Sequence, residues 1–377
     1  MPVSQIDFPE IKLGVTFDCP CGRTHRVPTR RILFGDSLNE LLSSIPDDEI
    51  PSGDILIVSG PKTRLIAGEG VAEHFHKRGR RTVVLEVERA DLATVSKVER
   101  AASACSLAVA VGGGNAIDAC KYSAHRLGIP FISIPTTISH DGVASPVASI
   151  SLGSKRTSLM TAPPILVAIT EPLIKHSPKR LIASGCADIL AKSTSLRDWL
   201  LGHIVKDEHI CRATFGLVAS ALLEIRRFIE DGGGDFILLS SAAVRCGLAM
   251  TLIGSSRPCS GAEHLFSHYI DGVGEGIGLH GEQVGMGAVL MAMRYEEFDI
   301  LPPRGVELTG AEIRNYLAKA GAPTSINDIQ VSKETAIRAL LECKEIRPER
   351  YTILHHAPLT HRGAANLLRK AGMLSDE

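Results

Sequence analysis

Two histidines four residues apart, His264 and His268, occur in the segment SGAEHLFSH. On a helix this spacing puts both imidazoles on one face. A third histidine, His280, follows a glycine-rich loop, and Asp188 stands upstream among cysteine, alanine and leucine. A carboxylate in such apolar surroundings must be neutralised, paired or bound to a cation. Two imidazoles and one carboxylate would form an open site for a divalent metal, although a single histidine is more often structural.

A glycine-rich turn, GGGNAID at 112–118, follows directly on the apolar run 107–111. Glycines let a backbone approach a pyrophosphate closely, and a helix N-terminus offers N–H groups and a favourable dipole. The turn departs from the GxGxxG pattern because Ile117 stands in place of the last glycine. A tight strand-to-helix turn without a ligand is therefore the alternative. We expect Asp118 in the first helical turn, where its carboxylate would also favour the dipole.

A polar loop, PTTISHDGVASP at 135–146, follows the next apolar run at 131–134. Doubly wound sheets bind ligands at the carboxyl ends of their strands, which is where this loop would lie. Thr136 and Ser139 are suitable hydroxyl donors to a cofactor, and Asp141 is suited to substrate hydroxyls. Turns are commonly polar, so a purely structural loop is the other interpretation.

The elements that must position these motifs fall into two classes. Apolar runs of strand length occur at 55–58, 82–85, 107–111 and 131–134. They alternate with stretches of helical length at 62–79, 91–105 and 115–127. Continuous apolar strands separated by helices indicate a parallel, Rossmann-like sheet covered on both faces. After Pro172, long helical stretches such as 187–203 and 209–229 follow, and DGGGD at 231–235 is expected to be a loop. We therefore expect an α/β dinucleotide-binding domain over 1–172 and an all-α C-terminal domain, which binds metal and substrate, over 173–377.

Length and charge narrow the function. A chain of 377 residues is too long for one compact core, and 41 basic against 42 acidic residues give a net charge of −1. Such a balance provides no basic field for nucleic acid. The N-terminus has no basic flank before an apolar run, and we expect no stretch long enough to span a bilayer. The expectation is a cytoplasmic protein without nucleic-acid or membrane partners.

The nine cysteines are scattered and odd in number, which favours reduced thiols over a disulfide framework. One cluster, Cys19-Pro20-Cys21-Gly22 with His25, has the residue types of a small metal clip. However, Cys-x-Cys is tighter than the usual spacer of zinc sites, and no second pair follows. We interpret the segment as a hairpin that precedes the first domain.

Together these motifs resemble the glycerol-1-phosphate dehydrogenases, in the iron-containing alcohol dehydrogenase and dehydroquinate synthase superfamily. The resemblance runs from SGPKTRLIAG at Ser59 to RPERYTIL at Arg347. Its most specific parts are IPTTISHDGVASPVASI, SPKRLIASGCADILAKSTSLRDW, and SGAEHLFSHYID with LHGEQVGMG. The resemblance therefore covers most of the chain.

The resemblance implies a role for each motif. The implied cofactor contacts are Gly113, Gly114, Asn115, Ala116, Ile117, Asp118, Thr136, Thr137, Ile138, Ser139 and Ser145. The implied metal ligands are Asp188, His264 and His280, and the implied substrate contacts are Asp141, Asp188 and His268. The catalytic set is then the three ligands with His268. The resemblance thus gives the two helical histidines different roles: His264 would bind the metal, and His268 would face the substrate.

Three departures from the family pattern leave the substrate and the metal open. Asn115 stands where family members commonly have lysine. Thr170 replaces an aspartate that family members often have at the end of the strand at this position. The CPCG opening is an extension that the shorter archaeal members lack. In this extension the chain is similar to the bacterial AraM-like branch.

The implied reaction is the reduction of dihydroxyacetone phosphate to sn-glycerol 1-phosphate by NADH or NADPH. A divalent metal, zinc or else nickel or iron, would act as a Lewis acid at the C2 oxygen while the cofactor delivers hydride. Asp141 would hold the terminal hydroxyl. Lys155 and Arg156 are candidate phosphate partners, although charged hairpin residues are usually only solvated. The loop that contains Lys62 has no acidic residue to repel a 2′-phosphate, so NAD and NADP both stay open.

Other functions compete with this one. A dehydroquinate-synthase-like cyclase and a polyol dehydrogenase belong to the same superfamily, and a non-catalytic nucleotide-binding regulator is an alternative of another class. A complete candidate ligand set argues against the regulator. We also expect a homo-oligomer, and the pathway, ether-linked phospholipid synthesis or another use of the product, stays open.

Overall fold

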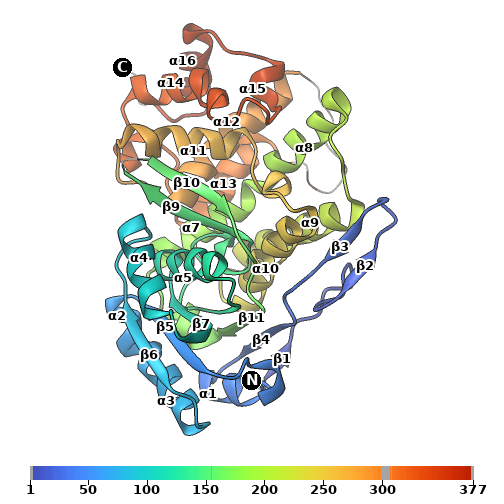
Figure 1. Cartoon of the computed structure of the whole chain (residues 1–377). Helices are drawn as coiled ribbons and strands as arrows, with labels where there is room; N and C mark the ends of the chain where they lie inside the picture. Colours follow the sequence, from blue (N-terminus) through green and yellow to red (C-terminus); the bar gives the residue numbers. More distant parts are fainter. Residues whose placement is uncertain (1–2, 154, 299–305, 307, 375–377) are drawn as a thin grey trace. The chain divides into compact units, whose positions relative to one another are not determined.

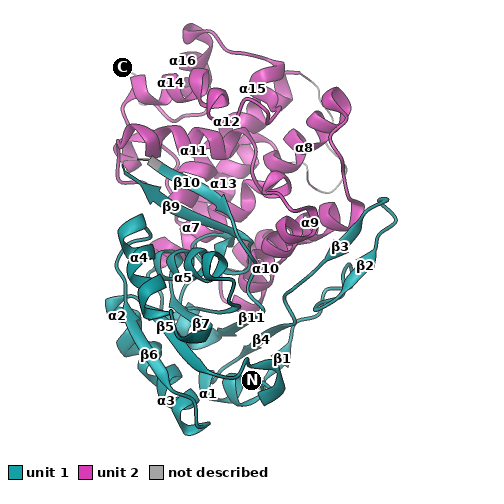
Figure 2. Cartoon of the chain, viewed as in Figure 1, with its two compact units in different colours: residues 1–178 teal, residues 179–377 magenta. Residues whose placement is uncertain are grey.

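A computed structural model describes residues 3–374 except 154, 299–305 and 307 (Figure 1). The chain forms two compact units, residues 1–178 and 179–377 (Figure 2). The division proposed from the sequence stood at residue 172.

The first unit is built on a seven-stranded sheet with the order β1-β4-β11-β8-β7-β5-β6. Its strands are β1 (Ser4–Gln5), β4 (Arg31–Gly35), β5 (Asp54–Ser59), β6 (Thr82–Glu86), β7 (Cys105–Gly112), β8 (Phe131–Pro135) and β11 (Leu166–Thr170). Only β1, which pairs with β4, runs antiparallel to its neighbour. The central strands are buried along almost their whole length, which is why they are apolar without alternation. The parallel sheet predicted from the apolar runs is confirmed.

Helices cover this sheet. They are α1 (Leu38–Ser43), α2 (Pro61–Thr63), α3 (Glu69–Lys77), α4 (Leu92–Ala101), α5 (Gly114–Leu127) and α6 (Glu171–Lys175). One apolar cluster joins α1 and α3 to alternate residues of the strands, among them Ile55 and Ile57. A separate cluster contains Val95 of α4 and Ala119 of α5. The helix predicted at 62–79 is confirmed, because the chain is helical from α2 through a π-helical turn, Arg64–Gly68, into α3.

Two hairpins stand outside the sheet. The first consists of β2 (Thr16–Asp18) and β3 (Thr24–Arg26), and the second of β9 (Val147–Leu152) and β10 (Lys155–Met160). The hairpin expected around CPCG is therefore confirmed.

Among its described residues the second unit contains helices and no strand. They are α7 (Lys179–Leu190), α8 (Lys192–Lys206), α9 (Arg212–Glu230), α10 (Phe236–Ile253), α11 (Ala262–Val273), α12 (His280–Glu297), α13 (Gly310–Ala320), α14 (Lys333–Glu342), α15 (Ile353–His356) and α16 (His361–Lys370). The helical stretch expected over 187–203 is confirmed, and it is divided between two helices, because α7 ends at Leu190 and α8 begins at Lys192. The DGGGD run lies between α9 and α10, where Gly232 and Gly233 have positive φ angles.

Helix α10 corrects the expectation about membrane-spanning stretches. By length and composition alone this helix could cross a bilayer. However, 78% of it is buried inside the protein. A mostly buried apolar helix is typical of the core of a globular unit.

Candidate metal and nucleotide sites

Three helices of the second unit bring Asp188, His264 and His280 together. Asp188 lies near the end of α7, His264 in the first turn of α11, and His280 at the start of α12. One ligand atom from each residue lies within 4.8 Å of the other two. The sequence separates these residues by up to 92 positions (280 − 188), so tertiary packing creates the cluster.

Glycines on α12 allow the close helix packing that this cluster needs. A Cβ atom at Gly281 would lie 2.0 Å from the carbonyl oxygen of Ser184 on α7. A Cβ atom at Gly287 would lie 2.8 Å from the carbonyl oxygen of Glu263 on α11. Both separations are shorter than any real carbon–oxygen contact, so only glycine permits α12 to approach both helices. The glycines of HGEQVGMG are therefore packing residues.

Asp188 is buried and has two partners besides His280. Lys192 donates a hydrogen bond from Nζ to its Oδ1 at 2.9 Å, and His264 Nε2 lies 3.4 Å from the same oxygen. Burial raises the pKa of Asp188, but the charges of Lys192 and His264 outweigh it and hold the pKa well below its usual range. Asp188 is therefore a carboxylate, the form that binds cations.

The second ring nitrogen of His264 contacts Glu263, at 2.8 Å between Nδ1 and Oε1. Glu263 is completely buried. It accepts hydrogen bonds from the hydroxyls of Ser195, at 2.6 Å, and Thr194, at 3.0 Å, and from the backbone N–H of Gly261, at 2.6 Å. Burial raises the pKa of Glu263, but the hydrogen bonds from His264 and Ser195 outweigh it and lower the pKa to about 2. The carboxylate thus fixes the ring so that Nε2 points at Asp188.

His280 and His268 complete the histidine cluster. His280 Nδ1 lies 3.2 Å from the hydroxyl of Ser267, which donates a hydrogen bond to Gln283 at 2.7 Å. The rings of His264 and His280 are 5.3 Å apart between centroids. His268 is partly exposed and stacks on His280 at 6.1 Å. The structure therefore places the ring of His268 beside those of His264 and His280.

The sequence alone indicates no role for Glu263. Its signal was a glutamate directly before a candidate ligand, in a segment that would be buried. Periodicity could not identify it, because its partners Thr194 and Ser195 come from α8, about 70 residues upstream (263 − 194 = 69).

In the first unit, the two predicted nucleotide segments lie side by side. Gly112 and Pro135 are register partners at the ends of β7 and β8, and Thr136 N–H donates to Gly112 O at 3.0 Å. A Cβ atom at Gly114 would lie 2.4 Å from Nε2 of His140. Helix α5 begins at Gly114, so its N–H groups are directed to this edge of the sheet.

The residues predicted to contact the cofactor differ in exposure and in partners. Ala116, Ile117, Thr136, Thr137, Ile138 and Ser145 are buried, Gly113, Gly114 and Ser139 are partly buried, and Asn115 is exposed. Asn115 donates a hydrogen bond to the Glu88 carbonyl at 2.8 Å, and Ser145 donates to the Val147 carbonyl at 3.2 Å. Asp141, predicted to bind substrate, begins a short 3-10 turn and is partly exposed. The hydroxyl of Thr137 is buried with no hydrogen-bond partner among the described residues, so a ligand with polar groups fits here.

The position expected for Asp118 is wrong. Helix α5 has no acidic residue in its first turn, and Asp118 lies one turn later, buried. Its Oδ1 is 3.5 Å from Nζ of Lys121, which is completely buried and donates to the carbonyls of Gly142 and Val147 at 2.7 Å each. An ion pair with Lys121, rather than the helix dipole, therefore explains why a carboxylate stands at position 118. Lys121 is a second residue whose role emerges only from the structure. The three-residue spacing from Asp118 is its signal in the sequence.

The structure gives no support for Lys155 or Arg156 as a phosphate partner. Arg156 is exposed and donates a hydrogen bond to Ser149 at 2.7 Å, and the side chain of Lys155 lies outside the described residues.

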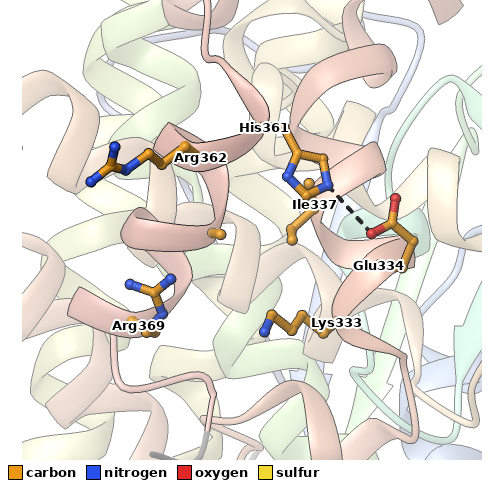
Figure 3. Close-up of a pocket in the computed structure, with 7 residues that line it drawn as sticks. Lys333, Glu334, Ile337, His361, Arg362 and Arg369 are labelled. Atoms are coloured by element: carbon orange, nitrogen blue, oxygen red, sulfur yellow. Dashed lines mark hydrogen bonds and ion pairs between the residues drawn. The ribbon is translucent and has the colours of Figure 1, made fainter.

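A surface pocket of about 580 Å³ lies elsewhere in the second unit, between α14 and α16 (Figure 3). It is lined by Lys333, Glu334, Ile337, His361, Arg362, Ala365 and Arg369. His361 and Glu334 form an exposed ion pair at 3.4 Å across it. The pocket shares no residue with the histidine cluster, so it is separate from the candidate metal site.

Comparison with known proteins first defines the class. A family model described as iron-containing alcohol dehydrogenase matches residues 36–178. The crystal structure of an iron-containing alcohol dehydrogenase from Corynebacterium glutamicum matches with a TM-score of 0.69 at 16% identity, over 93% of this chain and 97% of that one. At this identity the likeness shows the fold, a Rossmann-like unit followed by an all-helical unit.

Closer relatives define the family. The glycerol-1-phosphate dehydrogenase [NAD(P)+] of Pyrococcus furiosus is 38% identical over 86% of this chain and 92% of its own length. The protein of the same name from Cenarchaeum symbiosum is 41% identical over 71% and 73%. The chain belongs to the glycerol-1-phosphate dehydrogenase family. The resemblance inferred from the motifs is confirmed.

Proposed function

We propose that the protein is an NAD(P)-dependent, metal-dependent dehydrogenase that reduces dihydroxyacetone phosphate to sn-glycerol 1-phosphate. The names of its relatives support the substrate and the cofactor class. The observation that carries the proposal is the cluster of Asp188, His264 and His280, whose ligand atoms lie within 4.8 Å of one another.

This donor set fits a divalent cation. One ionised carboxylate and two imidazole nitrogens suit zinc best, with nickel or iron as alternatives, and they leave coordination positions open. The bound cation would supply Lewis-acid stabilisation of the negative charge that develops on the substrate oxygen. Asp188, His264 and His280 would hold the cation, and Glu263 would keep His264 in the required orientation.

The remaining roles belong to other side chains of the two units. His268, partly exposed beside His280, would position the substrate and hold or release a proton at the reacting oxygen. Asp141 would accept a hydrogen bond from the terminal hydroxyl of the substrate. The nicotinamide nucleotide would lie against the N-terminus of α5, from Gly113 to Asp118, and against Thr136, Thr137, Ile138, Ser139 and Ser145. Lys62 is exposed after β5 with no acidic neighbour in its turn, so we assign either NAD or NADP.

We further propose a cytoplasmic homo-oligomer without nucleic-acid or membrane partners. Leu65 and Ile66 support an oligomer, because they are 74% and 64% exposed in the turn before α3. Light scattering on the purified protein, with Leu65→Ser/Ile66→Ser as the variant, tests this assignment. A monomer in the wild type would contradict it.

The central test is His264→Ala, with His361→Ala as a matched control on the surface. We expect His264→Ala to lose the metal ion of this cluster and to lose dihydroxyacetone phosphate reduction, because two ligands hold a catalytic ion poorly. The control should retain both. Full activity with unchanged metal content in His264→Ala would remove the assignment.

The same assay separates the competing functions. A preference for dihydroxyacetone over its phosphate would indicate a polyol dehydrogenase. A reaction without net oxidation of NADH or NADPH would indicate a cyclase, and cofactor binding without turnover of any small ketone would indicate a regulator. Chiral analysis of the product tests the assignment of sn-glycerol 1-phosphate.

A further inference from the structure

We propose that the β2–β3 hairpin carries a second metal site, in which Cys19, Cys21 and His25 hold a zinc ion or a similar thiophilic cation. The two sulfur atoms and a ring nitrogen of His25 all lie within 4.8 Å of one another. Sγ of Cys21 is 3.3 Å from Nε2 of His25. None of these residues belongs to the cluster of Asp188, so the proposal does not rest on the function proposed above.

The turn explains why the two cysteines are separated by a single residue. The N–H of Gly22 donates to the Cys19 carbonyl at 3.0 Å, and the N–H of Cys19 donates to the Arg23 carbonyl at 3.0 Å. Pro20 occupies the second position of this turn, where its fixed φ is favoured, and Gly22 has a φ of +85°. The chain therefore reverses within four residues, which brings both thiols to one end of the hairpin.

The strand register supplies the third donor. His25 pairs with Phe17 across the hairpin, and their rings are 5.8 Å apart. Side chains alternate along a strand, so Cys19, two residues after Phe17, shares this face. Asp18 and Thr24 occupy the opposite face, where the threonine hydroxyl donates to the carboxylate at 2.6 Å. His25 is only 2% exposed, so its ring is held in place and not freely rotating.

The separations suit a tetrahedral ion. Zinc binds sulfur at about 2.3 Å and nitrogen at about 2.0 Å, which places the two donors roughly 3.5 Å apart. A thiol–imidazole hydrogen bond would explain the pair of Cys21 and His25, but it would not require the sulfur of Cys19 in the same place. Thiolates select softer metals than the carboxylate-containing cluster of the second unit does. The two sites should therefore differ in metal preference.

The hairpin also has a structural need for such a clip. Its strands have three residues each and pair with no other strand among the described residues. An isolated two-stranded hairpin is marginally stable in water, and a bound metal contributes its binding free energy to folding. Three protein donors leave one tetrahedral position, which water or one of the other seven cysteines (9 − 2) would occupy.

The first experiment counts metals in the full-length protein. After purification with zinc and removal of loosely bound ions, we expect two zinc ions per wild-type chain and one in Cys19→Ser/Cys21→Ser. His264→Ala should also retain one, bound at the hairpin, so a failure of either site is recognised separately. Thr24→Val, on the opposite face of the same hairpin, is the matched control and should retain two. One zinc in the wild type that the double variant keeps would overturn the proposal.

The second experiment identifies the donors. Replacement of zinc by cobalt(II) should give a sulfur-to-cobalt charge-transfer absorption in the wild type and in His264→Ala, and none in Cys19→Ser/Cys21→Ser. Alkylation of the holoenzyme, followed by peptide mass mapping, should show Cys19 and Cys21 protected until a chelator is added. Any further cysteine released by the chelator is the fourth ligand. Rapid alkylation of both thiols without chelator, or a Cys19–Cys21 disulfide in unreduced peptides, would overturn the proposal.

Discussion

Nε2 of His264 lies 3.4 Å from Oδ1 of Asp188, and this oxygen also accepts a hydrogen bond from Lys192 at 2.9 Å. Two cationic or polar groups from different helices therefore share one buried carboxylate oxygen. Lys192 is completely buried, so its charge and that of Asp188 balance each other inside the helical unit. A metal ion at this cluster would take over part of that balance, which makes Lys192 a sensitive probe of the site.

Replacement of Lys192 by methionine should destabilise the metal-free protein. The change leaves the carboxylate of Asp188 buried with one partner fewer, a loss on the order of 3–5 kcal/mol in unfolding free energy. Added zinc should then raise the melting temperature more in the variant than in the wild type, because the ion replaces the lost charge. Thermal denaturation with chelator and with zinc measures both effects. Lys333→Met, at an exposed lysine, is the control, and equal metal-induced shifts in all three proteins would contradict the prediction.

Glu263→Gln should weaken metal binding without removing a ligand. The carboxylate of Glu263 orients His264 and accepts hydrogen bonds that an amide nitrogen cannot accept, so we expect affinity to fall by about 10–100-fold. Competition with a chromophoric chelator measures the change. Activity should return at high metal concentration, unlike in His264→Ala. Glu73→Gln, at an exposed glutamate, is the control, and unchanged affinity in Glu263→Gln would contradict the orienting role.

Gly114→Ala should weaken nucleotide binding. The new Cβ would lie 2.4 Å from the ring of His140, so the ring or the start of α5 must shift. We expect the dissociation constant of the reduced cofactor to rise by about ten-fold or more, at least about 1.4 kcal/mol. Fluorescence titration measures it. Gly70→Ala, on a helix with no atom within 4 Å of the added carbon, should bind cofactor as the wild type does; matching affinities in the two variants would exclude a special role for Gly114.

The sequence predicts the α/β unit well because its central strands are apolar throughout and are separated by helices. It fails at β1, because a strand of two residues carries too few positions for a periodic signal. It also leaves out β4 and β11, although these strands are as long as the predicted β6 and β8. It also does not indicate the division at Ala191 between α7 and α8, since the local sequence ADILAKSTS has no proline or glycine and favours one continuous helix. Such a break depends on packing between helices and not on local propensity.

The candidate metal residues could be proposed from the sequence because histidine and aspartate at buried positions need partners. The partners themselves could not be found in the same way. Glu263 meets Ser195 through tertiary packing, and Lys121 reaches the carbonyls of a loop about 20 residues later (142 − 121 = 21). A single sequence does not show which of its distant positions are in contact in the folded protein.

The pair of Arg31 and Glu49 predicts a pH dependence of stability. Nε of Arg31 donates to both carboxylate oxygens, at 2.9 and 2.8 Å, and the hydrogen bonds from Arg31 lower the pKa of Glu49 below its usual 4.5. A lowered folded-state pKa stabilises the protein above pH 4.5, and this contribution is lost as the pH falls through the folded value. Glu49→Gln should therefore have a lower free energy of unfolding than the wild type at pH 7, by about 1 kcal/mol or less. Chemical denaturation at a series of pH values measures this gap, which should close at acidic pH. A gap that stays constant from pH 7 to well below pH 4.5 would contradict this.

Lys121 should hold the loop that contains the predicted cofactor and substrate contacts. Its ammonium group is completely buried between Asp118 and the carbonyls of Gly142 and Val147. Burial lowers the pKa of Lys121, and the charge of Asp118 counteracts this. Methionine at position 121 would leave a buried carboxylate and two carbonyls without their donor, at a cost of about 3–5 kcal/mol.

A double variant separates charge balance from packing at this position. Asp118→Asn/Lys121→Met removes both charges, so it should recover a large part of the stability that Lys121→Met loses, because no unpaired carboxylate stays buried. Chemical denaturation of the wild type, both single variants and the double variant measures the coupling. Cofactor affinity should be lower than in the wild type in both Lys121→Met and the double variant, since in each the carbonyls of Gly142 and Val147 lack their donor and the loop loses its anchor. Strictly additive losses would show instead that Lys121 and Asp118 act independently, and the loop would then owe its position to its own turn rather than to the buried ion pair.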